Sequence, residues 1–120
     1  MIRARAFLPS REDADAMILN RTAPELRAAR YERMVLDSGR AAREIAFGAI
    51  AVDGGALRCP VLVLSAGDDH ISPPSVQPKL VRKYGGEHRD FPGHAHSLPL
   101  EDGWEPAADA LLTWAEGVTS

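Results

Sequence analysis

Two polar loops carry the residues of this sequence that are best suited to acid–base chemistry. The first loop, residues 67–73, contains Asp69 within Gly-Asp-Asp-His-Ile-Ser-Pro, and the second, residues 92–97, contains His96 within Pro-Gly-His-Ala-His-Ser. A carboxylate that accepts a hydrogen bond from imidazole Nδ1 fixes the tautomer of the ring and stabilises the imidazolium once the other nitrogen takes a proton. The two loops therefore predict an Asp–His pair for proton transfer.

Each member of this pair has a neighbour that could replace it. Asp68 competes with Asp69 for the role of the carboxylate, and His94 competes with His96 for the role of the imidazole. The alternatives without chemistry are a carboxylate that only closes a turn and a histidine that only faces water. We favour Asp69 and His96, because the Gly-His-Ala-His context and the position after a strand suit a catalytic histidine.

A metal site is another interpretation of the same loops. His94 and His96 stand close enough in sequence for their imidazoles to share a metal ion with His70 and Asp69. The sequence shows no surrounding groups that would orient these ligands. The favoured interpretation therefore expects no metal and no cofactor.

The elements that must position the two loops are predicted in the second half of the chain. Residues 59–65 form a continuous apolar run, which is typical of a strand in a parallel sheet covered on both faces by helices. The following predicted elements are a helix from Pro73-Pro74 to Gly85-Gly86, a strand over residues 87–91 and a helix from about residue 104 to 116. Loops that leave the carboxyl ends of parallel strands converge, so this order brings Asp69 and His96 together.

The first half of the chain is predicted to form a small set of helices. Their expected spans are residues 12–19, 23–36 and 38–47. Thr22 and Glu25 have the spacing of a capping box for the second helix, and Ser38 can cap the third. The apolar stripes of these helices are thin, which indicates a lid laid on a larger body rather than an independent bundle.

Taken together, these residues resemble the C-terminal part of an α/β-hydrolase. The likeness is carried by Cys-Pro-Val-Leu-Val-Leu-Ser with the following Asp-His-Ile-Ser-Pro, by Lys-Tyr-Gly-Gly, by the Pro-Gly-His-Ala-His turn and by the closing Gly-Trp-Glu helix. The resemblance implies that Asp69 is the acid and His96 the histidine of a Ser-His-Asp triad. It also implies a helical cap-like segment over residues 1–55 and a C-terminal βαβα part of the core over residues 56–120.

The nucleophile of such an enzyme is missing from this sequence. Enzymes of the family place the serine in G-x-S-x-G between a strand and a helix, and that pentapeptide does not occur among the 120 residues. The closest approach, Asp37-Ser38-Gly39, lacks the first glycine and a preceding strand.

The predicted fold class is therefore α/β: a partial α/β-hydrolase fold with a short parallel sheet, flanking helices and a small helical cap segment. We expect the chain to supply Asp69 and His96 for hydrolysis of a small-molecule ester or related acyl bond, and to be inactive alone. The alternative is a non-catalytic remnant or an interaction subunit.

Composition and charge limit the partners of the chain. A net charge of −3, from 14 basic and 17 acidic residues, leaves no excess with which to bind a phosphate backbone, so no nucleic-acid partner is expected. No apolar run approaches the roughly 20 residues of a membrane span, so no membrane contact is expected.

The single cysteine, Cys59, cannot form an internal disulfide, which favours a cytoplasmic location. We interpret Cys59 as a small buried hydrophobe. The open edge of a two-stranded sheet predicts association with another chain.

Overall fold

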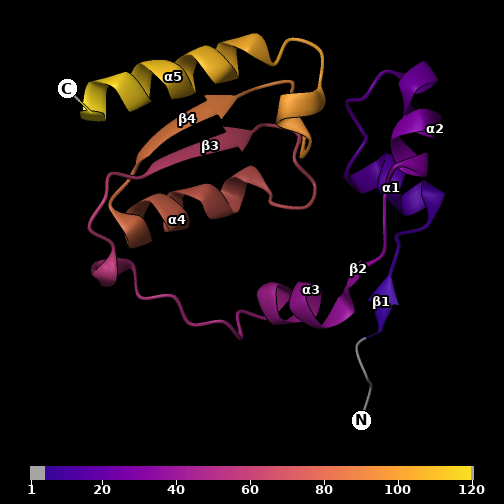
Figure 1. Ribbon diagram of the computed structural model, residues 1–120, viewed down its shortest axis with the longest axis horizontal. Coiled ribbons are helices and arrows are strands. Elements are labelled where there is room, and N and C mark those ends of the chain that lie inside the picture. Colours follow the sequence, from indigo (N-terminus) through magenta and orange to yellow (C-terminus); the bar gives the residue numbers. More distant parts are fainter. Residues whose placement is uncertain (1–4, 120) are drawn as a thin grey trace.

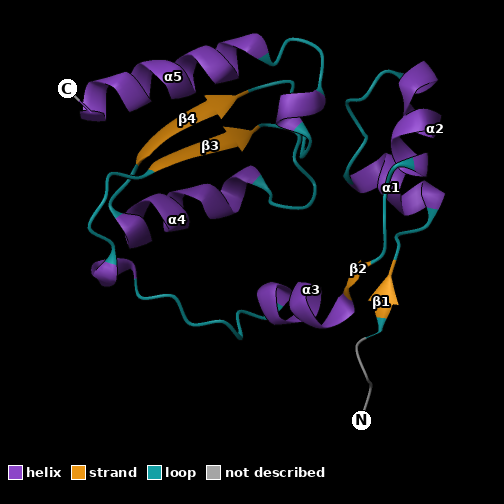
Figure 2. Cartoon of the chain, viewed as in Figure 1, coloured by secondary structure: helices purple, strands orange, loops and turns teal. Residues whose placement is uncertain are grey.

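The computed structural model describes residues 5–119 as five α-helices and two small sheets (Figures 1 and 2). The first part of the chain contains strand β1 (Ala6–Phe7), helices α1 (Arg11–Met17) and α2 (Pro24–Glu32), strand β2 (Asp37–Ser38) and helix α3 (Gly39–Ala46). The second part contains strand β3 (Leu62–Ala66), helix α4 (Gln77–Tyr84), strand β4 (Glu87–Phe91) and helix α5 (Glu105–Thr119). The fold is thus mixed α/β.

Strands β3 and β4 form the parallel sheet that organises the second part. Leu62 pairs with Glu87 at one end, and Ala66 pairs with Phe91 at the other. Helices α4 and α5 lie on either side of the sheet in Figure 1, and both contact β3. Because the two strands are parallel and in register, the loops that follow Ala66 and Phe91 leave the same edge of the sheet.

The predicted strand–helix–strand–helix order is confirmed. Strand β4 has the predicted bounds, and α4 ends at Gly85, whose φ of 63° is a left-handed conformation that stops a helix. Before α4, Pro74–Val76 forms a 3₁₀ turn, so the α-helix starts later than the proline pair indicates. Helix α5 continues to Thr119, and no helix within residues 5–119 has the length and apolarity needed to cross a membrane.

The capping box predicted for α2 is wrong. Pro24 occupies the first helical position, which suits its fixed φ, and this makes Ala23 the N-cap residue. The hydroxyl of Thr22 is consequently buried without a hydrogen-bond partner within the described part of the chain. The helix also ends at Glu32 rather than at residue 36, because the chain then extends into β2.

The other helices of the first part follow their local signals. The Ser38 hydroxyl accepts a hydrogen bond from the Ala41 backbone N–H at 3.2 Å, so the predicted cap of α3 is confirmed. Helix α3 ends shortly before Gly48, which has a φ of 62°. The short antiparallel pair of β1 and β2, with Phe7 opposite Asp37, was not predicted because neither strand is long enough to show alternation.

Much apolar surface stays exposed. The buried hydrophobic residues within the described chain are Ala14, Leu19, Ala66, Ala95 and Ala107. Four of these five are alanines, so the core contains little large apolar volume. Phe47 of the first part is 80% exposed and Leu112 of α5 is 58% exposed. A sheet of two strands is too narrow to cover the helices beside it.

Cys59 is free and exposed, so its interpretation as a buried hydrophobe is wrong. The apolar run that contains it begins before the strand does: β3 starts at Leu62. Pro60 has no backbone N–H to donate to a neighbouring strand, which keeps Cys59 in the connection that leads into the sheet.

A polar cluster around the buried Ser65 joins β3 to β4. Ser65, only 4% exposed, donates a hydrogen bond from Oγ to Asp90 Oδ1 at 2.5 Å. Its Oγ also lies 2.8 Å from His88 Nε2. The serine stands between the carboxylate and the imidazole, whereas a triad needs the imidazole in the middle. The cluster therefore links the two strands rather than activating Ser65.

We expect Ser65→Ala to lower the free energy of unfolding by about 1–3 kcal/mol, because it removes the hydrogen bonds of a buried hydroxyl with His88 and with the Asp90 carboxylate. Urea unfolding followed by circular dichroism measures the change. Ser75→Ala, in the exposed 3₁₀ turn before α4, is the matched control and should change stability little. Equal stability of the two variants would contradict a linking role for the cluster.

Candidate active site

Asp69 and His96 meet at the carboxyl edge of the parallel sheet. His96 Nδ1 lies 3.1 Å from Asp69 Oδ2 and 3.2 Å from Oδ1. An ionised carboxylate only accepts hydrogen bonds, so Nδ1 must be the donor. A neutral His96 then carries its proton on Nδ1, which leaves Nε2 able to accept a proton from another molecule.

The chain around Asp69 holds its carboxylate in place. Oδ1 accepts hydrogen bonds from the backbone N–H groups of Ile71 at 2.8 Å and Ser72 at 2.9 Å. These bonds close a turn directly after β3, and only 11% of the Asp69 side chain remains exposed. The carboxylate is therefore oriented by the backbone before it contacts His96.

His96 contacts Asp69 through Nδ1, and its ring also lines an open pocket. Its side chain is 41% exposed, and Nε2 has no hydrogen-bond partner within residues 5–119. The adjoining pocket has a volume of about 510 Å³. Its apolar lining includes Leu8, Met17, Ile18, Met34, Val35 and Ile71. The imidazole thus stands between a fixed carboxylate and an apolar space.

Asp68 has a different partner. Its Oδ2 accepts a hydrogen bond from Arg21 Nε at 2.7 Å, and its backbone carbonyl accepts one from Asn20 Nδ2 at 2.9 Å. The structure therefore brings Asp69, and not Asp68, to His96. Asp68 instead ties the first part of the chain to the loop after β3.

His94 also lies apart from the pair. Its Nδ1 is 3.3 Å from Glu101 Oε2 but has no hydrogen bond of good geometry, and the Glu101 carboxylate is buried. The same Oε2 accepts a hydrogen bond from the Ala95 N–H at 2.8 Å. Glu101 therefore fixes the backbone between His94 and His96. Sequence reasoning missed this residue, because an acidic residue before Asp-Gly looks like part of an exposed turn.

The end of α1 docks onto both loops of the site. His70 Nδ1 lies 2.8 Å from the Ala16 carbonyl oxygen, and the Ser97 hydroxyl donates to the Ile18 carbonyl oxygen at 3.3 Å. The last carbonyl groups of a helix have no partner inside the helix, so these side chains satisfy acceptors that would otherwise stay open. Such contacts to backbone atoms leave no signal in the sequence.

The structure does not bring together the four residues that the metal interpretation requires, His70, His94, His96 and Asp69. Within residues 5–119, no three His, Cys, Asp or Glu side chains are grouped so that they could hold a metal ion. His70 is bound to the carbonyl of Ala16, and His94 lies beside Glu101, so neither joins Asp69 and His96.

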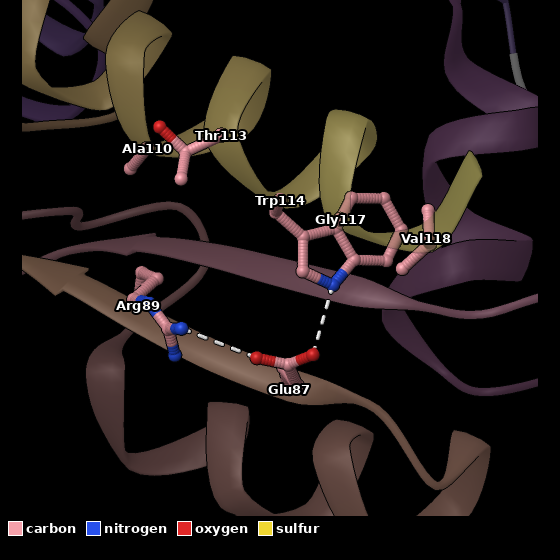
Figure 3. A pocket seen from close by; sticks show the side chains of 7 residues that line it. All are labelled: Glu87, Arg89, Ala110, Thr113, Trp114, Gly117 and Val118. Atoms are coloured by element: carbon pink, nitrogen blue, oxygen red, sulfur yellow. Dashed lines mark hydrogen bonds and ion pairs between the residues drawn. The ribbon is translucent and has the colours of Figure 1, made fainter. Parts of the chain in front are cut away.

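A second pocket, of about 430 Å³, lies between β4 and α5 at the opposite end of β4 (Figure 3). There Glu87 accepts a hydrogen bond from Trp114 Nε1 at 3.0 Å, and its other carboxylate oxygen pairs with Arg89 at 3.1 Å. These polar groups bind one another, and the lining contains no imidazole and no thiol. The side chains that line this pocket hold α5 against the sheet, and neither Asp69 nor His96 is among them.

Comparison with known proteins gives no match. No family model, curated protein or solved structure is significantly similar to this chain. The site consists of an imidazole that a carboxylate orients beside an apolar pocket.

We expect Asp69→Asn to reverse the tautomer of His96. The variant keeps an oxygen that can accept from Ile71 and Ser72, but it can turn an amide nitrogen toward His96 Nδ1. Because an amide nitrogen only donates, Nδ1 must then accept, and the proton moves to Nε2. NMR of nitrogen-labelled histidine, at a pH where His96 is neutral, reports which nitrogen is protonated.

Asp68→Asn is the matched control for this experiment, because Asp68 pairs with Arg21 and should not affect the ring of His96. An Nε2–H tautomer in the unmodified protein would contradict the orientation of His96 by Asp69.

Proposed function

We propose that this chain supplies the acid and the histidine of a Ser-His-Asp hydrolase of the α/β-hydrolase fold, acting on an ester or related acyl bond. The contact of 3.1 Å between His96 Nδ1 and Asp69 Oδ2 carries the proposal. Catalysis of this kind requires an imidazole whose Nδ1 is fixed by a carboxylate and whose Nε2 is free.

The two residues have distinct roles in the proposed reaction. His96 takes the proton of the serine hydroxyl on Nε2 as the oxygen attacks the acyl carbon, and it then gives that proton to the leaving alcohol. Asp69 stays ionised, holds the ring in position and stabilises the imidazolium. The hydrogen bonds that Asp69 accepts from two backbone N–H groups support this role, because they keep the carboxylate in one orientation.

Ser65 and Ser97 are bound elsewhere and do not provide the nucleophile. Ser97 follows His96 directly, but its hydroxyl is bound to the Ile18 carbonyl, and Ser65 is buried between Asp90 and His88. The proposal therefore requires a serine from another polypeptide segment that contains G-x-S-x-G.

The open edge of β3 is where such a segment would attach. Within the described residues, β3 pairs only with β4. The Val61 carbonyl and the Gly67 N–H bond to β4, so the backbone groups of Leu62 and Leu64 point to the open edge, while the Ala66 carbonyl accepts from the Asp69 N–H. A strand added there in parallel would end beside Asp69. A nucleophilic serine follows the end of its strand, so it would reach the same edge of the sheet as His96.

We expect no serine of the isolated chain to react with a fluorophosphonate probe. Mixed with a polypeptide that contains G-x-S-x-G and pairs with β3, the chain should restore labelling of the serine of that polypeptide and hydrolysis of an ester. His96→Ala should then lower kcat by a factor on the order of 10⁶.

His94→Gln is the control for the histidine variant and should keep most of the activity, because His94 does not touch Asp69. Labelling of a serine in the isolated chain, or full activity of His96→Ala in the mixture, would contradict the proposed role of His96. If no mixture is active but the chain still binds its neighbour, the alternative of a non-catalytic interaction subunit is favoured.

The open edge also predicts that the isolated chain associates as its concentration rises. Leu62→Pro should weaken this association, because it removes an edge N–H at the first residue of β3 and leaves the ladder to β4 intact. Size-exclusion chromatography over a range of concentrations measures the effect. Leu112→Lys, on the exposed side of α5, is the control, and loss of association in this variant alone would assign the contact to α5.

A further inference from the structure

Two arginines at the end of α2 lack a partner. Nη1 of Arg30 is buried without a hydrogen bond, and Arg33, the C-cap residue, makes no ion pair within residues 5–119. Arg11 and Arg21 of the first part of the chain do pair with carboxylates, Asp15 and Asp68. Arg30 differs from them because its buried nitrogen has no partner within the described residues.

Arg30 and Arg33 line one pocket of about 390 Å³. They stand three residues apart at the end of a helix, so both side chains lie on the same side of it. The rest of the lining is Leu19, Met34, Ser97 and Leu100, with no acidic residue. The pocket therefore combines two positive charges with apolar walls.

This pocket adjoins the apolar pocket beside His96. Arg33 and Met34 line both of them, and Ser97 of the first is the neighbour of His96 in the chain. Volumes of about 390 Å³ and 510 Å³ are within the usual size of small-molecule sites. One ligand could thus reach from the arginines to the imidazole.

The balance of charge differs between the two pockets: Arg33 lines both, but carboxylates line only the pocket beside His96. Asp13 and Asp37 border the pocket beside His96; the first accepts a hydrogen bond from Ser10 Oγ at 2.6 Å and the second from the Ser38 N–H at 2.6 Å. Neither forms an ion pair with Arg33. These carboxylates repel an anion from the His96 side, whereas the arginines attract it to the other pocket.

We propose that Arg30 and Arg33 bind a carboxylate at one end of an aliphatic substrate whose ester bond lies beside His96. A planar guanidinium binds a carboxylate through two parallel hydrogen bonds, and the bound anion satisfies the buried Nη1 of Arg30 and reduces the repulsion between the two cations. The identification of this ligand as a substrate rests on the proposed hydrolase function. It narrows the substrate class to aliphatic esters that carry a free carboxylate.

Octanoate and octanol are matched probes, because they share a chain length and differ in charge. We expect the full chain to bind octanoate at least tenfold more tightly than octanol in a calorimetric titration, and we expect added salt to weaken only octanoate binding. Arg30→Gln and Arg33→Gln should each weaken octanoate binding by about tenfold and leave octanol binding unchanged.

Arg43→Gln is the control, since Arg43 is exposed on α3 and lines neither pocket. Equal affinity of the unmodified chain for octanoate and octanol would overturn the inference without any variant having to fold. Loss of octanoate affinity in Arg43→Gln to the same extent would also overturn it. These titrations need no nucleophile, so intact octanoate binding with no esterase activity in the mixture would contradict the hydrolase proposal alone.

Discussion

The parallel, in-register pairing of β3 with β4 is the constraint from which the site follows. Both strands end at the same edge of the sheet, so the turn after Ala66 and the loop after Phe91 must leave the sheet side by side. The turn then fixes Asp69 through backbone N–H groups, and the loop presents His96 to it. An antiparallel pair would have sent the two loops to opposite ends of the sheet.

The same sheet explains why so much apolar surface is exposed. Each face of a two-stranded sheet is narrow. Helices α4 and α5 need a wider surface to bury their apolar residues. Leu112 on α5 remains 58% exposed, while the buried apolar residues within the described chain are almost all alanines. The open edge of β3 and these exposed side chains have the same cause, which is that the sheet has only two strands within the described residues. An added strand would pair the open edge of β3, which is the physical link between the stability of this chain and its proposed partner.

The sequence predicted those features that are set by residues close to one another in the chain. Gly85 ends α4 through its left-handed φ, and Ser38 caps α3, because both effects act within a few residues. The meeting of Asp69 and His96 was also predictable, since it needs only the order of the elements and a parallel sheet. The capping box at Thr22 failed because two local signals competed and the proline determined where the helix begins.

Features that depend on distant contacts could not be predicted in this way. The burial of Glu101 and its bond to the Ala95 N–H require the fold of the whole loop after β4. The exposure of Cys59 depends on where β3 starts, which the continuous apolar run does not mark. In both cases the residue type is compatible with several environments, and tertiary structure selects one of them.

The docking of α1 connects the pocket to the Asp–His pair. The carbonyl oxygens of Ala16 and Ile18 lie at the end of α1, where helical hydrogen bonding stops, and they are bound by His70 and Ser97 from the two loops. These bonds hold the residues that form one wall of the pocket beside His96, but they do not touch the carboxylate of Asp69. In the proposed enzyme, residues 7–37 therefore supply most of the pocket walls, while the loops after β3 and β4 transfer the proton. Arg21 also joins the first part of the chain to the loop after β3 through the Asp68 carboxylate, and none of these contacts involves the carboxylate of Asp69.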